Sequence, residues 1–180
     1  DATARRLSRD ERRIADLDLD EVRKLDVGSG LHPPTLDEVL AAFPGVHVNI
    51  DIKAHSLEAA VAVVELVQRR RDVRRVLLTS VDDAVVRYVR ATGYPGEVGV
   101  GKLGALMVLA TPRSVLRAVD NAGWIGRQAL QIPWRYKGLR FDRDTIVRRA
   151  HAAGLRVDYW TINDAELAKR IIRIGADGIM

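Results

Sequence analysis

The pattern that most constrains this chain is an alternation of short apolar runs with helical segments from about residue 46 onward. Six runs are candidate strands: 46–53, 75–80, 97–101, 129–133, 156–162 and 177–180. Each run is short, apolar and mostly bounded by glycine, proline or polar residues, which is typical of a strand buried in a parallel sheet. Parallel strands joined by crossover helices predict an α/β fold.

The segments between these strands carry residues that favour helix ends. The predicted helix starts lie at Thr35 with Glu38, at Ser56, at Thr111 with Pro112, and at Asn163 or Asp164. The first of these is a capping box, and the others place a polar side chain or a proline where the first turn needs one. Apolar stripes at helical spacing follow two of them, over 57–67 and 167–174, and Gly175 is placed to end the last helix.

The spacing of the strands favours a closed barrel over an open sheet. The candidate strands follow one another about every 26 residues, which suits a (β/α)8 barrel of roughly 250 residues. Only six units are visible, so we expect residues 1–180 to form one partial barrel domain that supplies about strands three to eight. A doubly wound open sheet is the alternative, but the glycines of 98–104 do not have the spacing of its phosphate-binding loop.

Composition removes several function classes. The chain has no cysteine, which excludes a disulfide-stapled module, a thiolate metal site and a catalytic cysteine. No run approaches the roughly 18 apolar residues of a membrane span. The first residues have no apolar core of a secretory leader. We therefore expect a cytoplasmic protein, with a leader before Asp1 left open.

The positive charge has a structural explanation. The net charge is +5, and we count 24 arginines among the 29 basic residues. Many of these arginines fall in the last turns of predicted helices, where cations complement the helix dipole. The basic cluster at 5–13 contains acidic residues and no aromatic ones, unlike a single-strand platform. We expect no nucleic-acid partner and leave peripheral membrane contact and oligomeric state open.

The most informative strand end is Asn-Ile-Asp-Ile-Lys at 49–53. Side chains alternate along a strand, so Asn49, Asp51 and Lys53 share one face and the two isoleucines share the other. The isoleucines suit the outer helices, which turns the polar trio toward the barrel mouth, where active sites of this architecture lie. Asp51 would be an oxygen ligand for Mg²⁺ or Ca²⁺, and Lys53 a point charge for phosphate. The structural alternative is a buried ion pair between Asp51 and Lys53.

Other strand ends give weaker signals. Ser80, Gln131 and Trp160 end or lie within predicted strands and are candidate substrate contacts. Trp160 could wall a pocket or pack as a structural cap. His55 is the histidine nearest the expected mouth, although contact with substrate is its less favoured role, and we expect structural or solvated roles for three histidines: His32, His47 and His151.

Six segments, in order and at comparable spacing, resemble the glycerophosphodiester phosphodiesterase family. They are PTLDEVL at 34–40, NIDIK at 49–53, LLTS at 77–80, AHAAGLRV at 150–157, YWTIND at 159–164 and GADGI at 175–179. The resemblance covers nearly the whole chain. It implies a (β/α)8 barrel that hydrolyses small-molecule glycerophosphodiesters to glycerol 3-phosphate and an alcohol with a divalent cation.

The resemblance also assigns residues and shows departures. Asp51 falls on a metal-binding glutamate of the family, Lys53 on its lysine, and Trp160 on its substrate-wall aromatic. The family's two acid-base histidines and two further metal carboxylates have no counterpart in this sequence, so we expect the chain to be inactive alone. The alternatives are a barrel that binds a phosphorylated ligand or partner without turnover, and a lipid phosphodiesterase like lysophospholipase D.

Overall fold

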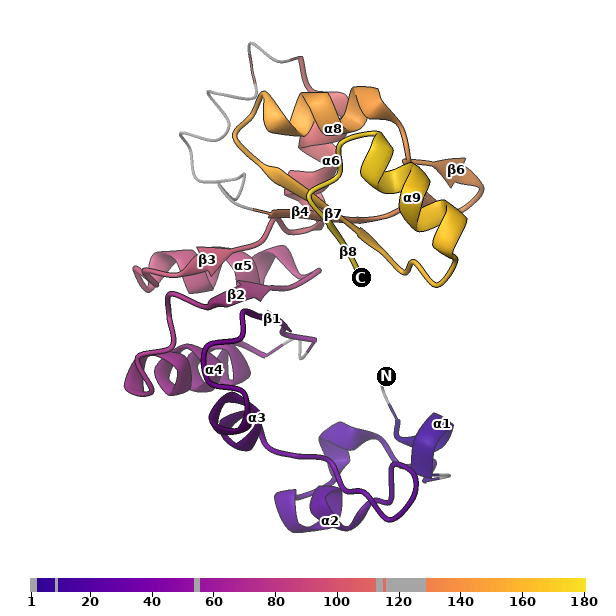
Figure 1. The fold of residues 1–180 in the computed structure, drawn as a ribbon. Helices are drawn as coiled ribbons and strands as arrows, with labels where there is room; N and C mark the ends of the chain where they lie inside the picture. Colours follow the sequence, from indigo (N-terminus) through magenta and orange to yellow (C-terminus); the bar gives the residue numbers. More distant parts are fainter. Residues whose placement is uncertain (1–2, 9, 54–55, 113–114, 116–128) are drawn as a thin grey trace. The chain divides into compact units, whose positions relative to one another are not determined.

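The computed structural model describes residues 3–8, 10–53, 56–112, 115 and 129–180 (Figure 1). The chain divides into two compact units, Asp1–Val46 and His47–Met180, and each is described by itself. No helix in the described part of the chain has the length and apolar character needed to cross a bilayer.

The first unit consists of short helices with strong caps. Its elements are α1 (Arg5–Ser8), the 3-10 turn η1 (Ile14–Asp16), α2 (Leu19–Lys24) and α3 (Leu36–Ala42). The capping box predicted at Thr35 and Glu38 is confirmed, because each side chain bonds the backbone N–H of the other. Asp18 and Glu21 form a second capping box at the start of α2, which the sequence analysis did not identify.

The second unit alternates strands and helices as predicted. Its elements are β1 (Val48–Asp51), α4 (Leu57–Arg69), β2 (Val76–Thr79), α5 (Asp83–Ala91), β3 (Glu97–Val98), α6 (Lys102–Ala110), β4 (Ala129–Pro133), β5 (Arg135–Tyr136), β6 (Leu139–Arg140), α8 (Asp144–His151), β7 (Arg156–Trp160), α9 (Ala165–Arg173) and β8 (Gly178–Ile179). Every parallel strand lies inside a predicted range. The antiparallel hairpin of β5 and β6 was not predicted.

The parallel strands follow one another in chain order. One sheet has the order β1-β2-β3 and the other β4-β7-β8. A parallel bridge between Gly99 and Ala129, with the Val100 amide donating to the Ala129 carbonyl at 3.0 Å, joins them. An open doubly wound sheet reverses its strand order at a switch point, and this run shows no reversal. The observed order is the sequential order that the sequence predicts for these strands.

The predicted helix ends are largely confirmed. The Ser56 hydroxyl accepts from the Ala59 amide at 3.3 Å, and the Asp164 carboxylate accepts from the Leu167 amide at 2.7 Å. Gly175 follows α9 with a φ of +93°, a conformation that ends a helix and favours glycine. The start predicted at Thr111 and Pro112 runs into residues outside the described part of the chain.

The core lies between the sheet and its helices. Leu130, Val157 and Tyr159 of the strands are fully buried against Val147 of α8 and Ile171 of α9. Because parallel strands need cover on their outer face, α8 and α9 place apolar side chains there. Polar side chains at strand ends are thereby confined to the inner face and to the two ends of the sheet.

A buried carboxylate ties the hairpin to the last helix. Asp142, whose side chain is 1% exposed, accepts hydrogen bonds from Arg140 at 3.0 and 2.7 Å and pairs with Arg170 of α9. The hydrogen bonds from Arg140 hold the pKa of Asp142 below its usual range, although burial opposes them. A depressed carboxylate pKa stabilises the fold above the unfolded pKa of about 4, and this stability is lost as pH falls through the folded value.

We therefore expect Asp142→Asn to destabilise the protein by about 1–3 kcal/mol at neutral pH, because two arginines lose their anionic partner. The difference from wild type should shrink below about pH 4. Urea unfolding across this pH range measures it. Asp144→Asn, which breaks an exposed pair with Arg148, is the matched control and should cost under about 0.5 kcal/mol. A difference that does not vary with pH would contradict this role for Asp142.

Candidate functional site

A cavity of about 500 Å³ opens at the carboxyl ends of the strands. Its lining comes from the ends of β1, β2, β4 and β7, from α6, and from the hairpin. The lining residues are Asp51, Thr79, Ser80, Val81, Val100, Gly101, Lys102, Ala105, Leu106, Leu109, Gln131, Ile132, Pro133, Tyr136, Phe141 and Trp160. Four residues predicted separately, Asp51, Ser80, Gln131 and Trp160, are thus brought together around one space.

Asp51 and Lys53 form an ion pair at the end of β1. The pair is exposed rather than buried, with 36% of the Asp51 side chain and 67% of the Lys53 side chain accessible. The structural alternative of a buried pair is therefore wrong. An exposed pair contributes roughly 0–1 kcal/mol, so either group can exchange its partner for a cation or a phosphate at low cost.

Asn49, whose side chain is exposed among the described residues, joins a polar network with partners on β4 and after β8. Its side-chain amide donates to the Gln131 oxygen at 3.3 Å and contacts the Met180 sulfur at 3.5 Å. Gln131 in turn donates to Asp158 at 3.3 Å, and Asp158 accepts from Arg156 at 2.8 Å. We call Asn49, Gln131, Asp158 and Arg156 the interior network.

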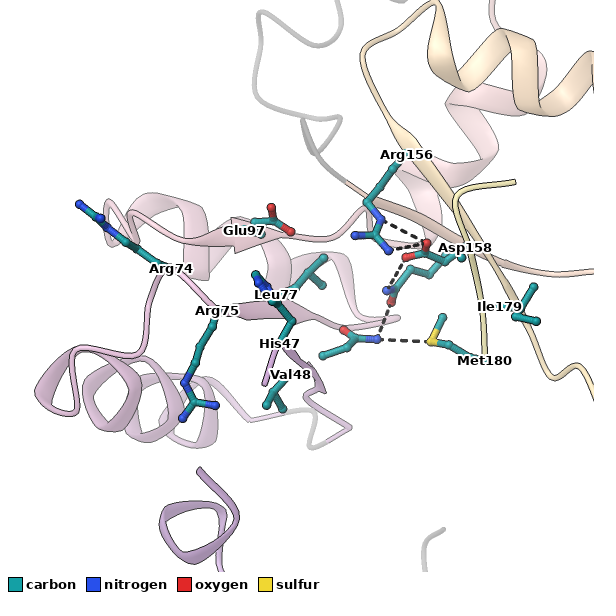
Figure 2. A pocket seen from close by; sticks show the side chains of 13 residues that line it. His47, Val48, Arg74, Arg75, Leu77, Glu97, Arg156, Asp158, Ile179 and Met180 are labelled. Carbon is teal, nitrogen blue, oxygen red and sulfur yellow. Dashed lines mark hydrogen bonds and ion pairs between the residues drawn. The ribbon is translucent and has the colours of Figure 1, made fainter. Parts of the chain in front are cut away.

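Asp158 is the buried charge of the interior network. The residue is 3% exposed, and its carboxylate is held by Arg156 and Gln131. A β-carbon at Gly178 would collide with this carboxylate, so the neighbouring strand has glycine at this position. A hollow of about 210 Å³ lies beside the network toward the strand starts, lined by His47, Arg74 and Glu97 among others (Figure 2).

The two remaining predicted contacts, Trp160 and Ser80, have different surroundings. Trp160 is 38% exposed and lines the cavity, which fits the predicted wall. Ser80 is 3% exposed; its hydroxyl donates to the Ile52 carbonyl at 2.7 Å and accepts from the Asp82 amide at 3.1 Å. Because both contacts are to backbone, this hydroxyl braces the loop after β2.

Neither His47 nor His151 is among the residues that line the cavity, and His32 belongs to the first unit. His32 contacts the Leu25 carbonyl at 3.0 Å, and His151 of α8 contacts Asp177 at 2.8 Å. Burial raises the pKa of Asp177, but the bonds from His151 and the Val157 amide outweigh it and leave this pKa lowered. His55 lies outside the described residues.

Sequence reasoning missed several residues around the cavity. Lys102, Leu106 and Leu109 come from α6, whose apolar run gave no sign of an inner face, and Tyr136 comes from the unpredicted hairpin. The signal for the hairpin was Lys137-Gly138, whose φ values of +47° and +84° match a two-residue turn between antiparallel strands.

The site offers one carboxylate for a cation. Within the described ranges, no group of three His, Cys, Asp or Glu residues could hold a metal ion. Asp51 by itself is a suitable oxygen ligand for a divalent cation, which needs several such ligands. The chemistry of Asp51 therefore fits a shared site to which other residues contribute.

Comparison with known proteins identifies the family. The family described as "Glycerophosphoryl diester phosphodiesterase family" matches residues 1–180. The chain belongs to this family. It is 32% identical over 165 residues to "Probable glycerophosphodiester phosphodiesterase 2" of Mycobacterium tuberculosis, which covers 91% of this chain and 62% of that relative. The chain therefore spans less than two thirds of that relative's length.

Solved structures of this family share the fold. One is an Oleispira antarctica phosphodiesterase in complex with the product sn-glycerol-3-phosphate, at 22% identity and a TM-score of 0.76, covering 100% of this chain and 72% of that chain. Another is a glycerophosphodiester phosphodiesterase from Thermotoga maritima, at 21% identity and a TM-score of 0.69, with the same coverage.

The interior network predicts a measurable loss of stability. Asp158→Ala should destabilise the complete protein by about 1–3 kcal/mol, because it removes the buried acceptor that holds Gln131 and the half-exposed Arg156. Asp158→Asn keeps the shape and an oxygen acceptor and should cost less. Urea unfolding of the two variants measures the difference. Equal stability of Asp158→Ala and wild type would show that the network does not support the interior.

Proposed function

We propose that the complete protein hydrolyses glycerophosphodiesters with the help of a divalent cation. The observation that carries this proposal is the position of Asp51 and Lys53 at the end of β1, beside the cavity that Trp160 walls. These residues fall on the family's metal-binding, phosphate-binding and substrate-wall positions. The family membership of the chain supports the same reaction class.

The residues of this chain have distinct roles in the proposed reaction. The Lys53 ammonium would bind a phosphate oxygen, and the Asp51 carboxylate would hold the cation. The ion pair between Lys53 and Asp51 would then be replaced by a contact from Lys53 to the substrate and one from Asp51 to the metal. The Trp160 ring would pack on the apolar part of the substrate. A bound divalent cation would neutralise phosphodiester oxygens. Water then forms a bond to phosphorus, the bond to the alcohol oxygen breaks, and the alcohol takes a proton.

We further propose that the described strands correspond to strands three to eight of a (β/α)8 barrel. The chain order of the strands supports this, as does the contact from Asn49 on β1 to Met180 beyond β8. Among the strands described, β1 and β8 each have one neighbour. The acid-base histidines and two further metal carboxylates would then come from parts of the protein other than these residues, and the chain alone would be inactive.

The alternative is a barrel that binds a phosphorylated ligand without turnover. It is favoured by one feature: Asp51 is one methylene shorter than the family's glutamate and is paired with Lys53. A shorter carboxylate either draws the cation toward β1 or holds it weakly. The two candidates differ in their expected turnover: the hydrolase should turn over substrate with Asp51 or with a glutamate at this position, and the binding protein with neither.

The first test is turnover of glycerophosphocholine by the complete protein. We expect Asp51→Ala and Lys53→Ala each to lower kcat/KM by about 100-fold or more, and EDTA to abolish turnover. Lys169→Ala and Glu166→Ala, which remove an exposed pair on α9, are matched controls and should leave the rate unchanged. Unchanged rates in the Asp51 and Lys53 variants would show that the site is elsewhere.

The second test separates catalysis from binding. Asp51→Glu should retain turnover within about tenfold of wild type, because the carboxylate that the cation needs is kept. Asp51→Asn should raise the metal concentration for half-maximal rate by about tenfold or more, because the charge is lost. Titration of Mg²⁺ or Ca²⁺ against rate measures both. If wild type and Asp51→Glu bind metal but neither turns over substrate, the non-catalytic alternative holds.

A further inference from the structure

The hairpin of β5 and β6 presents two apolar side chains to solvent. Tyr136 is 54% exposed and Leu139 is 66% exposed. They lie opposite each other in the antiparallel register, so they share one face of the hairpin. The hairpin follows β4 directly, which places it at the carboxyl ends of the strands, and Figure 1 shows β6 projecting beyond the end of β4.

The same hairpin is cationic. Its sequence over 135–140 is RYKGLR, with three basic residues and no acidic one. The Lys137 ammonium lies 5.6 Å from the centre of the Tyr136 ring. Arg140 is engaged by Asp142, but within the described part of the chain Arg135 and Lys137 form no ion pair. Two cations therefore flank the exposed apolar pair without an anionic partner among the described residues.

The apolar surface continues from the hairpin onto the rim of the cavity. Val81 is 56% exposed and Leu106 is 53% exposed, and both line the cavity together with Tyr136. Lys102, at the start of α6, adds another exposed cation to this rim. Apolar and basic side chains thus occur together at one end of the strands.

We propose that this end of the protein docks on an anionic phospholipid bilayer, with Tyr136 and Leu139 entering the headgroup layer. A tyrosine ring suits the boundary between water and acyl chains, and Leu139 gains by leaving water. Each cation near an anionic membrane adds about fivefold in affinity. A nucleic acid would use the cations and the ring but gain nothing from Leu139. The proposal goes beyond the hydrolysis, and its test measures binding.

The test is flotation of the complete protein with vesicles of phosphatidylcholine, either alone or with about one third phosphatidylglycerol. Wild type should bind the anionic vesicles at least about fivefold more tightly. The double variant Tyr136→Ser with Leu139→Ser should lose about tenfold in binding. The double variant Arg135→Glu with Lys137→Glu should lose the preference for anionic vesicles. Wild-type binding that is absent, or equal for both vesicle types, would overturn the proposal.

The controls change exposed residues of α9 that do not line the cavity. They lie in the last turn of α9, after Arg170, which pairs with Asp142. Ile172→Ser changes a side chain of similar exposure, 58%, and Arg173→Glu reverses a charge there. Both should bind vesicles as wild type does. A loss equal to that of the hairpin variants would mean that net composition, not the hairpin, controls binding.

A second readout places the hairpin in the lipid directly. The chain contains no cysteine, so Leu139→Cys can carry an environment-sensitive fluorophore after any cysteine elsewhere in the complete protein is replaced. Its emission should shift to the blue with anionic vesicles, whereas a label at Ile172→Cys should not. Identical behaviour at both positions would overturn the proposal. Leu139→Ser should not alter turnover of soluble glycerophosphocholine. The turnover assay therefore tests the hydrolysis proposal independently of the vesicle assays, which test membrane binding.

Discussion

The two-residue period of β1 is the constraint on which the candidate site depends. A strand in a parallel sheet must be apolar toward its helices, and Ile52, 6% exposed, meets that requirement. The residues between the isoleucines then have to face inward, whatever their chemistry. Asn49 and Asp51 are therefore on one face, but at different positions along the strand. Asn49 reaches the interior network, whereas Asp51 reaches the cavity at the strand end.

This difference in position separates support from chemistry. Asn49, Gln131 and Asp158 are joined by hydrogen bonds, and the buried Asp158 would destabilise the fold if it were left without a partner. At the strand end the Asp51–Lys53 pair is exposed, so water and salt weaken it. The hydrogen bonds of the interior network hold β1 in position. The ion pair between Asp51 and Lys53 is weak, so each of these two side chains can exchange its partner. A strongly buried pair could not do so.

The strands and most helix ends could be predicted because local patterns determine them. The periodicity around residues 48–51 and the caps at Thr35 and Asp164 are properties of a few neighbouring residues. The network from Asn49 to Asp158 could not be predicted, since its partners are 82 and 27 residues apart along the chain. Ser80 lines the cavity, but its bond to the Ile52 carbonyl depends on where two loops meet. Long-range contacts of this kind leave no periodic signal.

The hairpin shows why an unpredicted element can matter most at a functional surface. Its strands are two residues each, too short for an alternating pattern, so only the Lys137-Gly138 pair distinguishes it from a loop in the sequence. Asp142 holds it down on one side through Arg140 and Arg170, which leaves the opposite face, with Tyr136 and Leu139, without cover from the described residues. The buried Asp142 carboxylate anchors this hairpin, and two apolar side chains remain in water beside the cavity of about 500 Å³. Exposed apolar side chains are stabilised when an apolar partner covers them, and we propose that a bilayer does so here. The cations beside them, which have no anionic partner among the described residues, favour an anionic bilayer.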